Sequence, residues 1–357
     1  MIPSIVERDA VSSHTVEAQR VLRSMGYVSE IFACTWGPEM EGRVRPIADI
    51  PREGGGGQWI CYQGSIGSPA AQVVADHPAP KMVDYHNITP TEYVERWMPA
   101  LGEEVRLGRR QLAELAPLVD FAVADSAFNC TELDAWGYRT TRVSALMMDL
   151  SAFECPPDRG LAAAIAGAKN EGGADWLFVG QMLPHKAHQD VVKAFDCYLK
   201  LYDPKARLHL IGRPSCGEYA LALRRFVERL GIGASVNLAG SVSAAELSAY
   251  YRAADVLVCC SDHEGFCAPL LEAMHHGIPV VAYGAAAVGE TVLDAGIVLP
   301  TKEPVRVATA AREVLSDREL RETLIDRGRR RSAAFTLEAA RQAFRENIEL
   351  AVGAWGT

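Results

Sequence analysis

The chain has 357 residues, of which 49% are hydrophobic and 23% charged, and its 36 basic and 45 acidic side chains leave a net charge of −9. This globular composition excludes a disordered or collagen-like chain, and the sequence lacks the run of about 18 apolar residues that a membrane span needs. At roughly 150 residues per domain, the length predicts two domains. Because no basic stretch followed by an apolar run opens the chain, we expect a cytoplasmic protein.

The negative charge lies mainly in the first half of the chain. Residues 1–150 hold 13 basic and 20 acidic side chains, whereas residues 151–357 hold 23 and 25. An acidic surface repels phosphate backbones and anionic lipids, so nucleic acid and membrane partners are disfavoured. Two interpretations of the acidic first half remain: the charge serves only solubility, or the first half binds a neutral or cationic ligand.

Nine cysteines are spread along the chain without any C-x-x-C pair. An odd number at irregular spacing is typical neither of a disulfide framework nor of a zinc site. Four of the histidines form two pairs in sequence, His185 with His188 and His275 with His276, and neither pair has a third ligand at metal spacing. We therefore expect reduced thiols and no bound metal.

Short apolar runs alternate with helical segments through the first half. The pattern predicts a strand at Ile5-Val6, a helix from about His14 to Met25, a strand over 27–33 and a long helix over 91–118. Further strands are expected at 59–63, 81–85, 121–124 and 142–146.

A linker candidate, residues 154–174 with its Pro-Pro and Gly-Gly pairs, precedes a second alternating series. Strands are expected there at 176–180, 207–212, 235–240, 256–260 and 279–283. Strands separated by helices are typical of βαβ units, so we predict the α/β class, with two doubly wound, Rossmann-like domains facing across a cleft. The predicted domains are 1–152 and 153–334, and a last helix within 335–357 is expected to pack back onto the first domain.

The most informative run is SDHEGFCAPLLEAMHHGIP, residues 261–279. It follows an apolar strand, and Pro269 near the start and Gly277 at the end punctuate a helix. The loop before that helix presents backbone N–H groups and a helix dipole, which together suit a diphosphate. Glu264 and Glu272 flank this anion site, which indicates that each carboxylate accepts hydrogen bonds from hydroxyl groups.

This run resembles the E-x7-E signature of the bacterial family 4 retaining glycosyltransferases, which have the GT-B fold. Further similarity lies in FVG at 178–180 with PHK at 184–186, LIG at 210–212, VNLAG at 236–240, and, in the first half, GSIGSP at 64–69, VDYHNITP at 83–90 and ADS at 124–126. The resemblance extends over nearly the whole chain and implies a donor site in the second domain and an acceptor surface in the first.

The resemblance implies a role for individual residues. Glu264 would contact hydroxyls of the transferred sugar, Glu272 would hold the ribose, and Lys186 would neutralise the leaving diphosphate. The implied donor-binding residues are Gly180, Gln181, Lys186, Arg213, Gly265, Phe266, Cys267, Ala268 and Glu272, and the implied catalytic residues are His86, Lys186 and Glu264. On the acceptor side it implies Asp9, His86 and Asn87, with His86 near the reacting carbon; a purely structural, hydrogen-bonded His86 is the alternative.

Two positions depart from the family pattern. Gln181 stands where the family usually has an arginine, which would be a second cation on the leaving diphosphate and worth about 2–4 kcal/mol in the transition state. Arg213 is a candidate to supply that charge. Cys267 replaces a common glycine, although only its backbone N–H is required.

The implied function is metal-independent transfer of a hexose from a nucleotide sugar, with no other cofactor, to a small-molecule or glycan hydroxyl. UDP-glucose or UDP-N-acetylglucosamine is favoured as the donor, followed by GDP-mannose, and the acidic first half suggests an aminocyclitol-type acceptor. A metal-dependent GT-A enzyme is disfavoured because the chain has no Asp-x-Asp. The alternatives are a GT-B epimerase or phosphorylase, or a degenerate transferase with a binding role.

Overall fold

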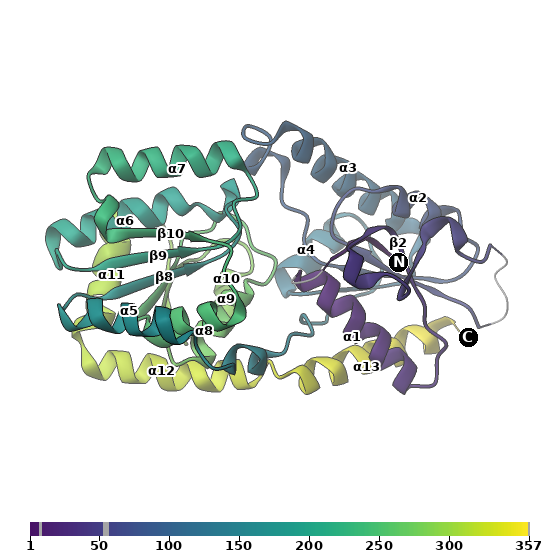
Figure 1. The fold of residues 1–357 in the computed structure, drawn as a ribbon. Coiled ribbons are helices and arrows are strands. Elements are labelled where there is room, and N and C mark those ends of the chain that lie inside the picture. Colours follow the sequence, from purple (N-terminus) through teal and green to yellow (C-terminus); the bar gives the residue numbers. More distant parts are fainter. Residues whose placement is uncertain (7–8, 53–56, 356–357) are drawn as a thin grey trace. The chain divides into compact units, whose positions relative to one another are not determined.

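The computed structural model describes residues 1–6, 9–52 and 57–355 and divides the chain into two units (Figure 1). The first unit comprises residues 1–148 and 335–357, and the second comprises residues 149–334. The first crossing between the units thus lies four residues before the boundary expected from the sequence, and the second lies at the expected place. Residues 356–357 of the expected last helix are outside the described part.

The first unit is built on parallel strands. They are β1 (Ile2–Ile5), β2 (Ile31–Trp36), β3 (Val44–Pro46), β4 (Ile60–Gly64), β5 (Lys81–Tyr85), β6 (Phe121–Ala124) and β7 (Thr141–Val143). The strand orders are β1-β2-β3 and β4-β5-β6-β7, and the Gln63 amide donates to the Met1 carbonyl (2.8 Å) where β1 meets β4. Its helices are α1 (Ala10–Ser24), α2 (Pro69–Asp76), α3 (Pro99–Leu115), α4 (Ala127–Ala135) and α13 (Leu337–Trp355).

The last helix of the chain belongs to the core of this first unit. Phe344 and Ile348 of α13 are fully buried in one cluster with Val21 of α1 and Met82 of β5. A guanidinium–carboxylate pair between Arg341 and Glu17 adds a partly buried ion pair to the α1–α13 contact. Burial of large apolar side chains of this kind stabilises by about 1.5–3 kcal/mol each, so α13 is an integral part of the first unit.

The second unit holds one six-stranded parallel sheet in the order β10-β9-β8-β11-β12-β13. Its strands are β8 (Asp175–Val179), β9 (Arg207–Ile211), β10 (Val236–Gly240), β11 (Val256–Cys259), β12 (Val280–Tyr283) and β13 (Ile297–Leu299). Its helices are α5 (Arg159–Asn170), α6 (His188–Leu201), α7 (Gly217–Leu230), α8 (Ala244–Ala253), α9 (Ala268–His275), α10 (Val288–Val292), α11 (Pro304–Ser316) and α12 (Arg318–Ala333). In this unit α6 packs against α11, α5 against α8 and α12 against α9 (Figure 1).

These topologies confirm the predicted class of two Rossmann-like units. In the second unit the order 3-2-1-4-5-6 places β8 and β11 side by side, with Trp176 paired to Val256. The chain reverses its direction of winding between these two strands, and ligands of open α/β sheets bind at that point, outside the carboxyl ends. The loops after β8 and β11 are therefore where a ligand of the second unit is expected.

Several predicted elements have other bounds in the structure. The first strand spans Ile2–Ile5 instead of Ile5-Val6, and the first helix begins at Ala10 instead of His14. The strand expected over 27–33 begins only at Ile31, because the Tyr27 amide still caps α1 by donating to the Leu22 carbonyl (3.1 Å). The long helix expected over 91–118 starts at Pro99, since proline keeps the preceding Met98 out of the helical region. The strand expected at 142–146 ends at Val143. Within the described residues no helix is long and apolar enough to cross a membrane.

Candidate functional site

Two loops at the carboxyl edge of the second sheet meet at one ion pair. The loop after β8 ends in a short turn, Pro184–Lys186, and the loop after β11 runs from Cys260 to Cys267. The Asp262 amide donates to the His185 carbonyl (2.7 Å), which ties the two backbones together. This contact follows from the pairing of β8 with β11, because neighbouring parallel strands deliver their loops to the same edge.

Lys186 and Glu264 form that ion pair. The Lys186 Nζ lies 2.8 Å from Oε1 and 2.7 Å from Oε2 of Glu264, and the two side chains are 21% and 7% exposed. Burial would lower the pKa of Lys186, but the Glu264 carboxylate outweighs it and raises the pKa above its ordinary value. The site thus holds a fixed ammonium at the carboxyl edge of the sheet, next to the first turn of α9.

The backbone between Glu264 and α9 has a defined shape. Thr291 donates through its hydroxyl to the Phe266 carbonyl (2.6 Å), and the Ala287 amide donates to the Glu264 carbonyl (3.1 Å). Cys267 caps α9 with φ of 67°, in the left-handed region. Helix α9 then runs from Ala268 to His275 with Pro269 in its first turn, as the sequence predicts. Gly265 and Ala268 are partly exposed and Phe266 is buried.

Glu272 lies one turn into α9 and is buried. Its Oε2 accepts a 2.5 Å hydrogen bond from the Tyr251 hydroxyl of α8, and the Tyr251 ring stacks on His276 at 4.9 Å. Burial raises the pKa of Glu272 to about 7, although the hydrogen bond from Tyr251 works in the opposite direction. Tyr251 is a partner that the sequence analysis missed, because no spacing rule links residues of different helices.

The loops after β8 and β9 approach each other closely at Gly180. Gly212 has φ of 153°, and a Cβ atom there would lie 1.8 Å from the Gly180 carbonyl oxygen, so glycine is required at 212. Gln181 is exposed and its Oε1 accepts from the Ser215 hydroxyl (2.9 Å). Arg213 is exposed on the same pair of loops, where the Met182 amide donates to its carbonyl (2.8 Å). The structure therefore brings Gly180, Gln181 and Arg213 together.

In the first unit, His86 belongs to a buried polar network. Its Nδ1 lies 3.0 Å from Oδ1 of Asp125, and its Nε2 lies 2.6 Å from Oε1 of Gln63 and 3.6 Å from Oδ1 of Asp84. Asp84 in turn lies 2.9 Å from Nε2 of His14. The imidazole of His86 is 0% exposed. The ring nitrogens are thus engaged with protein groups.

Two carboxylates keep the His86 imidazole charged. Burial by itself would lower the pKa of His86, but Asp125 and Asp84 outweigh it and raise the pKa to about 9. His86 and His14 likewise hold the pKa of Asp84 below its usual range against the effect of burial. The sequence analysis missed His14, Gln63, Asp84 and Asp125 as partners of this network, and the available signal was the placement of Asp84 and Asp125 at the ends of adjacent strands.

The stability of the first unit should therefore depend on pH. A folded pKa of about 9 against an ordinary 6.5 stabilises the native state below pH 6.5, and this contribution is lost as the pH rises through 9. We expect the free energy of unfolding to fall by about 3 kcal/mol across that window. His86→Gln should lack this fall in chemical denaturation measured at several pH values, whereas His77→Gln, a buried histidine outside the network, should keep it. An unchanged pH profile in His86→Gln would contradict the assignment.

The two other predicted acceptor-side residues have local structural roles. Asp9 caps α1, and its Oδ2 accepts from the Ser12 amide (2.9 Å) and hydroxyl (2.8 Å). Asn87 follows His86 with φ of 64° and donates through Nδ2 to Oδ1 of Asn129 (2.8 Å). Both positions follow strands at the carboxyl edge of the first unit's sheets.

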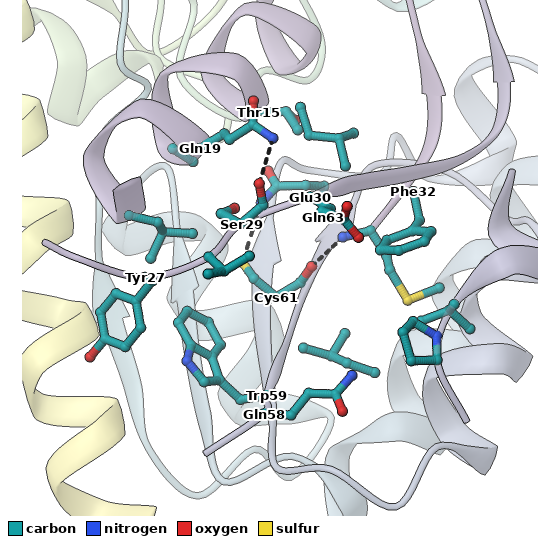
Figure 2. Close-up of a pocket in the computed structure, with 18 of the residues that line it drawn as sticks. Thr15, Gln19, Tyr27, Ser29, Glu30, Phe32, Gln58, Trp59, Cys61 and Gln63 are labelled. Carbon is teal, nitrogen blue, oxygen red and sulfur yellow. Dashed lines mark hydrogen bonds between the residues drawn. The ribbon is translucent and has the colours of Figure 1, made fainter. Parts of the chain in front are cut away.

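The first unit also has a cavity of about 490 Å³, which the sequence did not indicate. Figure 2 shows residues that line it. It is lined by Thr15 and Gln19 of α1, by the segment before β2 and by the start of β4, where Tyr27 meets Trp59 edge to face at 6.0 Å. Its lining comes mainly from the amino ends of β2 and β4, opposite to the edge where parallel sheets bind ligands. We therefore assign it no part in the candidate site.

Comparison with known proteins places the second unit in a described family. Residues 164–331 match the family model for glycosyl transferases group 1. The D-inositol 3-phosphate glycosyltransferase of Kineococcus radiotolerans is 30% identical over 265 residues, which cover 68% of this chain and 60% of that protein. The O-antigen chain mannosyltransferase B of Escherichia coli is 30% identical over 162 residues, 45% of this chain and 42% of that protein. The chain thus spans about half of each of these relatives.

Solved structures share the fold over nearly the full chain. A sucrose-phosphate synthase from Thermosynechococcus elongatus superposes with a TM-score of 0.76 at 19% identity, over 99% of this chain and 100% of that one. Anabaena HepE, solved in complex with UDP-glucose, gives 0.74 at 15% identity, over 98% and 99%. At these identities the likeness concerns the fold.

Proposed function

We propose a reaction for this chain from the premise that it belongs to the group 1 glycosyltransferases through residues 164–331 and has the GT-B fold. The proposed reaction transfers a hexose from a nucleotide-diphosphate donor to a hydroxyl group with retention of configuration. The single observation that carries the proposal is the partly buried Lys186–Glu264 pair beside the first turn of α9. An ammonium at that point suits a diphosphate, and a carboxylate beside it suits sugar hydroxyls.

The donor is proposed to lie across the loops after β8 and β11. Lys186 would share its N–H groups between Glu264 and the diphosphate, so that the charge that develops on the leaving group meets a fixed ammonium. The backbone of Gly265, Phe266, Cys267 and Ala268 would face the phosphate and the sugar. Glu272 would accept from the ribose hydroxyls, and it accepts more strongly when it is ionised.

The leaving phosphate itself would take the acceptor's proton as the acceptor hydroxyl attacks on the face from which the diphosphate departs. The new glycosidic bond forms as the bond to the phosphate oxygen breaks, so no enzyme nucleophile is required. The charge on the diphosphate is offset by Lys186, Arg213 and the α9 dipole. Transfer should therefore persist in the presence of a chelator.

On the acceptor side we propose Asp9, His86 and Asn87. The charged, fully buried imidazole of His86 would act mainly through its electrostatic field and by holding the loop that begins at Asn87. Asp9 would keep its capping contact to Ser12 while it presents its remaining oxygen lone pairs.

For the substrates we propose a UDP-hexose donor and a cyclitol acceptor. The HepE structure contains UDP-glucose, and six relatives are named as D-inositol 3-phosphate glycosyltransferases. The net −7 charge of residues 1–150 favours an amine-bearing cyclitol over an anionic one. An aminocyclitol should then show a KM that rises steeply with salt, and indifference to salt would overturn this choice.

The direct test measures binding and product together. Thermal unfolding with UDP, GDP, dTDP and ADP should show stabilisation by one nucleotide, by about 2.7 kcal/mol at 100 times its Kd. NMR of a reaction with the matching α-linked nucleotide sugar and a cyclitol should show an α-glycoside. Release of the sugar as a β-glycoside, or stabilisation by none of the nucleotides, would overturn the proposal.

Gln181 distinguishes a slow enzyme from a degenerate binding protein. Gln181→Arg introduces the usual cation on an exposed loop position, so it should fold normally and raise kcat at least tenfold in a slow enzyme. The control Gln342→Arg adds the same charge at an exposed position of α13 and should change nothing. Absence of transfer in both the wild type and Gln181→Arg would favour the binding role.

The epimerase and phosphorylase alternatives predict other products. An epimerase would convert the nucleotide sugar with no acceptor present, and a phosphorylase would need inorganic phosphate. Incubation of the donor alone, followed by NMR of the sugar, separates both from a transferase, which should leave the donor intact or hydrolyse it slowly.

A further inference from the structure

Two cysteines and Glu264 converge in the loop after β11. The thiols of Cys259 and Cys267 and a carboxylate oxygen of Glu264 all lie within 4.8 Å of one another, and the three residues are buried. Cys259 ends β11, Cys267 caps α9, and Glu264 lies in the loop between them. The sequence does not indicate this cluster, because Cys259 and Cys267 are eight residues apart and come together only where the loop turns back.

The backbone at Cys267 indicates that its thiol is needed. Its φ of 67° lies in the left-handed region, which is strained for a residue other than glycine. A glycine there would avoid that strain and still offer the same backbone N–H. What the cysteine adds is a thiol, and this thiol is hydrogen-bonded to Cys259. Backbone strain that is retained in this way supports a function for the side chain.

The charges around the cluster suit a divalent cation. Lys186 and Glu264 form an ion pair with no net charge. Two thiolates bound to a divalent cation likewise have no net charge, so a cation held by both sulfur atoms leaves the cluster neutral. A net charge is costly in a buried site, which favours a divalent ion.

The geometry and the donor atoms indicate the kind of ion. Two thiolates with one carboxylate suit zinc, which binds in tetrahedral sites with bonds of about 2.3 Å to sulfur. Such bonds hold two sulfur ligands about 3.8 Å apart, and the three ligand atoms already lie within 4.8 Å of one another. Lys186 contacts both oxygens of Glu264, so it can stay on one oxygen while the other binds the ion, as supporting groups of metal ligands commonly do.

We propose that Cys259, Cys267 and Glu264 form a binding site for zinc or a similar thiol-preferring divalent cation, with water in the fourth position. We further infer that the bound ion inhibits transfer, because it occupies the carboxylate that would contact the sugar. The inhibition rests on the function proposed above, whereas the binding does not.

Binding is tested with Co²⁺ on the full-length, reduced protein. We expect one equivalent of Co²⁺ to produce thiolate charge-transfer absorption and tetrahedral ligand-field bands, with about two protons released per ion. Cys259→Ser and Cys267→Gly should both lose the charge-transfer absorption, and zinc should abolish it in the wild type. The control Cys197→Ser, on α6, should behave as the wild type does.

The variants keep the test decisive. Cys267→Gly relieves the positive φ and should fold at least as stably as the wild type, so a lost signal there reports the thiol. No charge-transfer absorption in the wild type would overturn the site. Absorption that persists in both Cys259→Ser and Cys267→Gly would overturn it as well, since other cysteines would then be the ligands.

Inhibition is measured separately. Zinc should slow sugar transfer by the wild type at least tenfold, and Cys259→Ser should resist it while it keeps the wild-type response to nucleotide. If Co²⁺ binds as expected and zinc leaves transfer unchanged, the inhibitory role is wrong. If the protein transfers no sugar at all, the proposed function fails while the Co²⁺ spectra still decide the site.

Discussion

Glu272→Gln is expected to remove a pH-dependent loss of stability from the second unit. Because the folded pKa of Glu272 is about 7 against an ordinary 4.5, the native state keeps a proton that the unfolded chain loses as the pH rises through this window. The wild type should therefore lose about 3 kcal/mol of its free energy of unfolding between pH 4.5 and 7 through this one group. The glutamine has no such titration.

The readout is the difference in melting temperature between variant and wild type. This difference should grow in favour of Glu272→Gln by roughly 6 to 12 °C between pH 4.5 and 7, and stay level above pH 7. Glu313→Gln, at an exposed position of α11, should show no such trend. A flat difference for Glu272→Gln would mean that the buried carboxyl does not titrate in this window.

The same substitution should abolish the response to nucleotide. In the proposed site the carboxylate holds the ribose, and the amide that replaces it is a weaker acceptor without charge. The wild type should gain about 2.7 kcal/mol at 100 times the Kd of its nucleotide, and the variant should gain almost nothing at that concentration. A variant that is more stable and still binds nucleotide fully would exclude Glu272 from the donor site. The buried carboxyl of Glu272 would then lower the stability of the protein for a reason other than nucleotide binding.

Lys186→Met is expected to have the second large effect, on stability and on transfer alike. The substitution leaves the Glu264 carboxylate, which is only 7% exposed, without its ammonium partner. Removing one member of a buried pair costs about 3–5 kcal/mol, because the remaining charge stays desolvated. Loss of the cation on the diphosphate should also lower kcat a hundredfold or more.

A double variant separates the two effects. In Lys186→Met with Glu264→Gln no charge is left unpaired, so most of the stability should return while transfer remains lost. Arg318→Met breaks a pair with Glu322 in which the two side chains are 90% and 62% exposed, and it should leave the stability nearly unchanged. Equal stability losses for Lys186→Met and Arg318→Met would contradict the burial of the Glu264 carboxylate, and unchanged kcat would contradict the role of Lys186.

Local rules predicted the loop and helix that carry the donor residues. Pro269 and Gly277 mark the ends of a helix by steric and conformational preferences that act within a few residues, and α9 runs from Ala268 to His275 between them. The alternation of strands and helices likewise predicted two parallel sheets. The hydrophobic periodicity of each segment reflects how that one element is buried, so it can be recognised locally. The start of the long helix was predicted wrongly, because Pro99 keeps the residue before it out of the helical region.

Contacts between distant segments were decided by the tertiary structure. His14 and Asp84 are 70 residues apart and pair only because α1 packs on the sheet that contains β5. The network that encloses His86, the Tyr251–Glu272 hydrogen bond and the Lys186–Glu264 pair all arise in this way. Sequence spacing describes periodicity along one element, and it holds no information about which elements become neighbours.

By itself the sequence determined the class of fold, the positions of most elements and the residue types gathered after β8 and β11, since these depend on periodic burial and on local backbone preferences. Only the tertiary structure decided which of those residues form ion pairs, which of them carry a proton and which are in buried contact. Pairing of strands brought Lys186 to Glu264, and the turn of one loop brought Cys259 to Cys267. Charge and protonation depend on distance and burial in space, and those are properties of the folded chain.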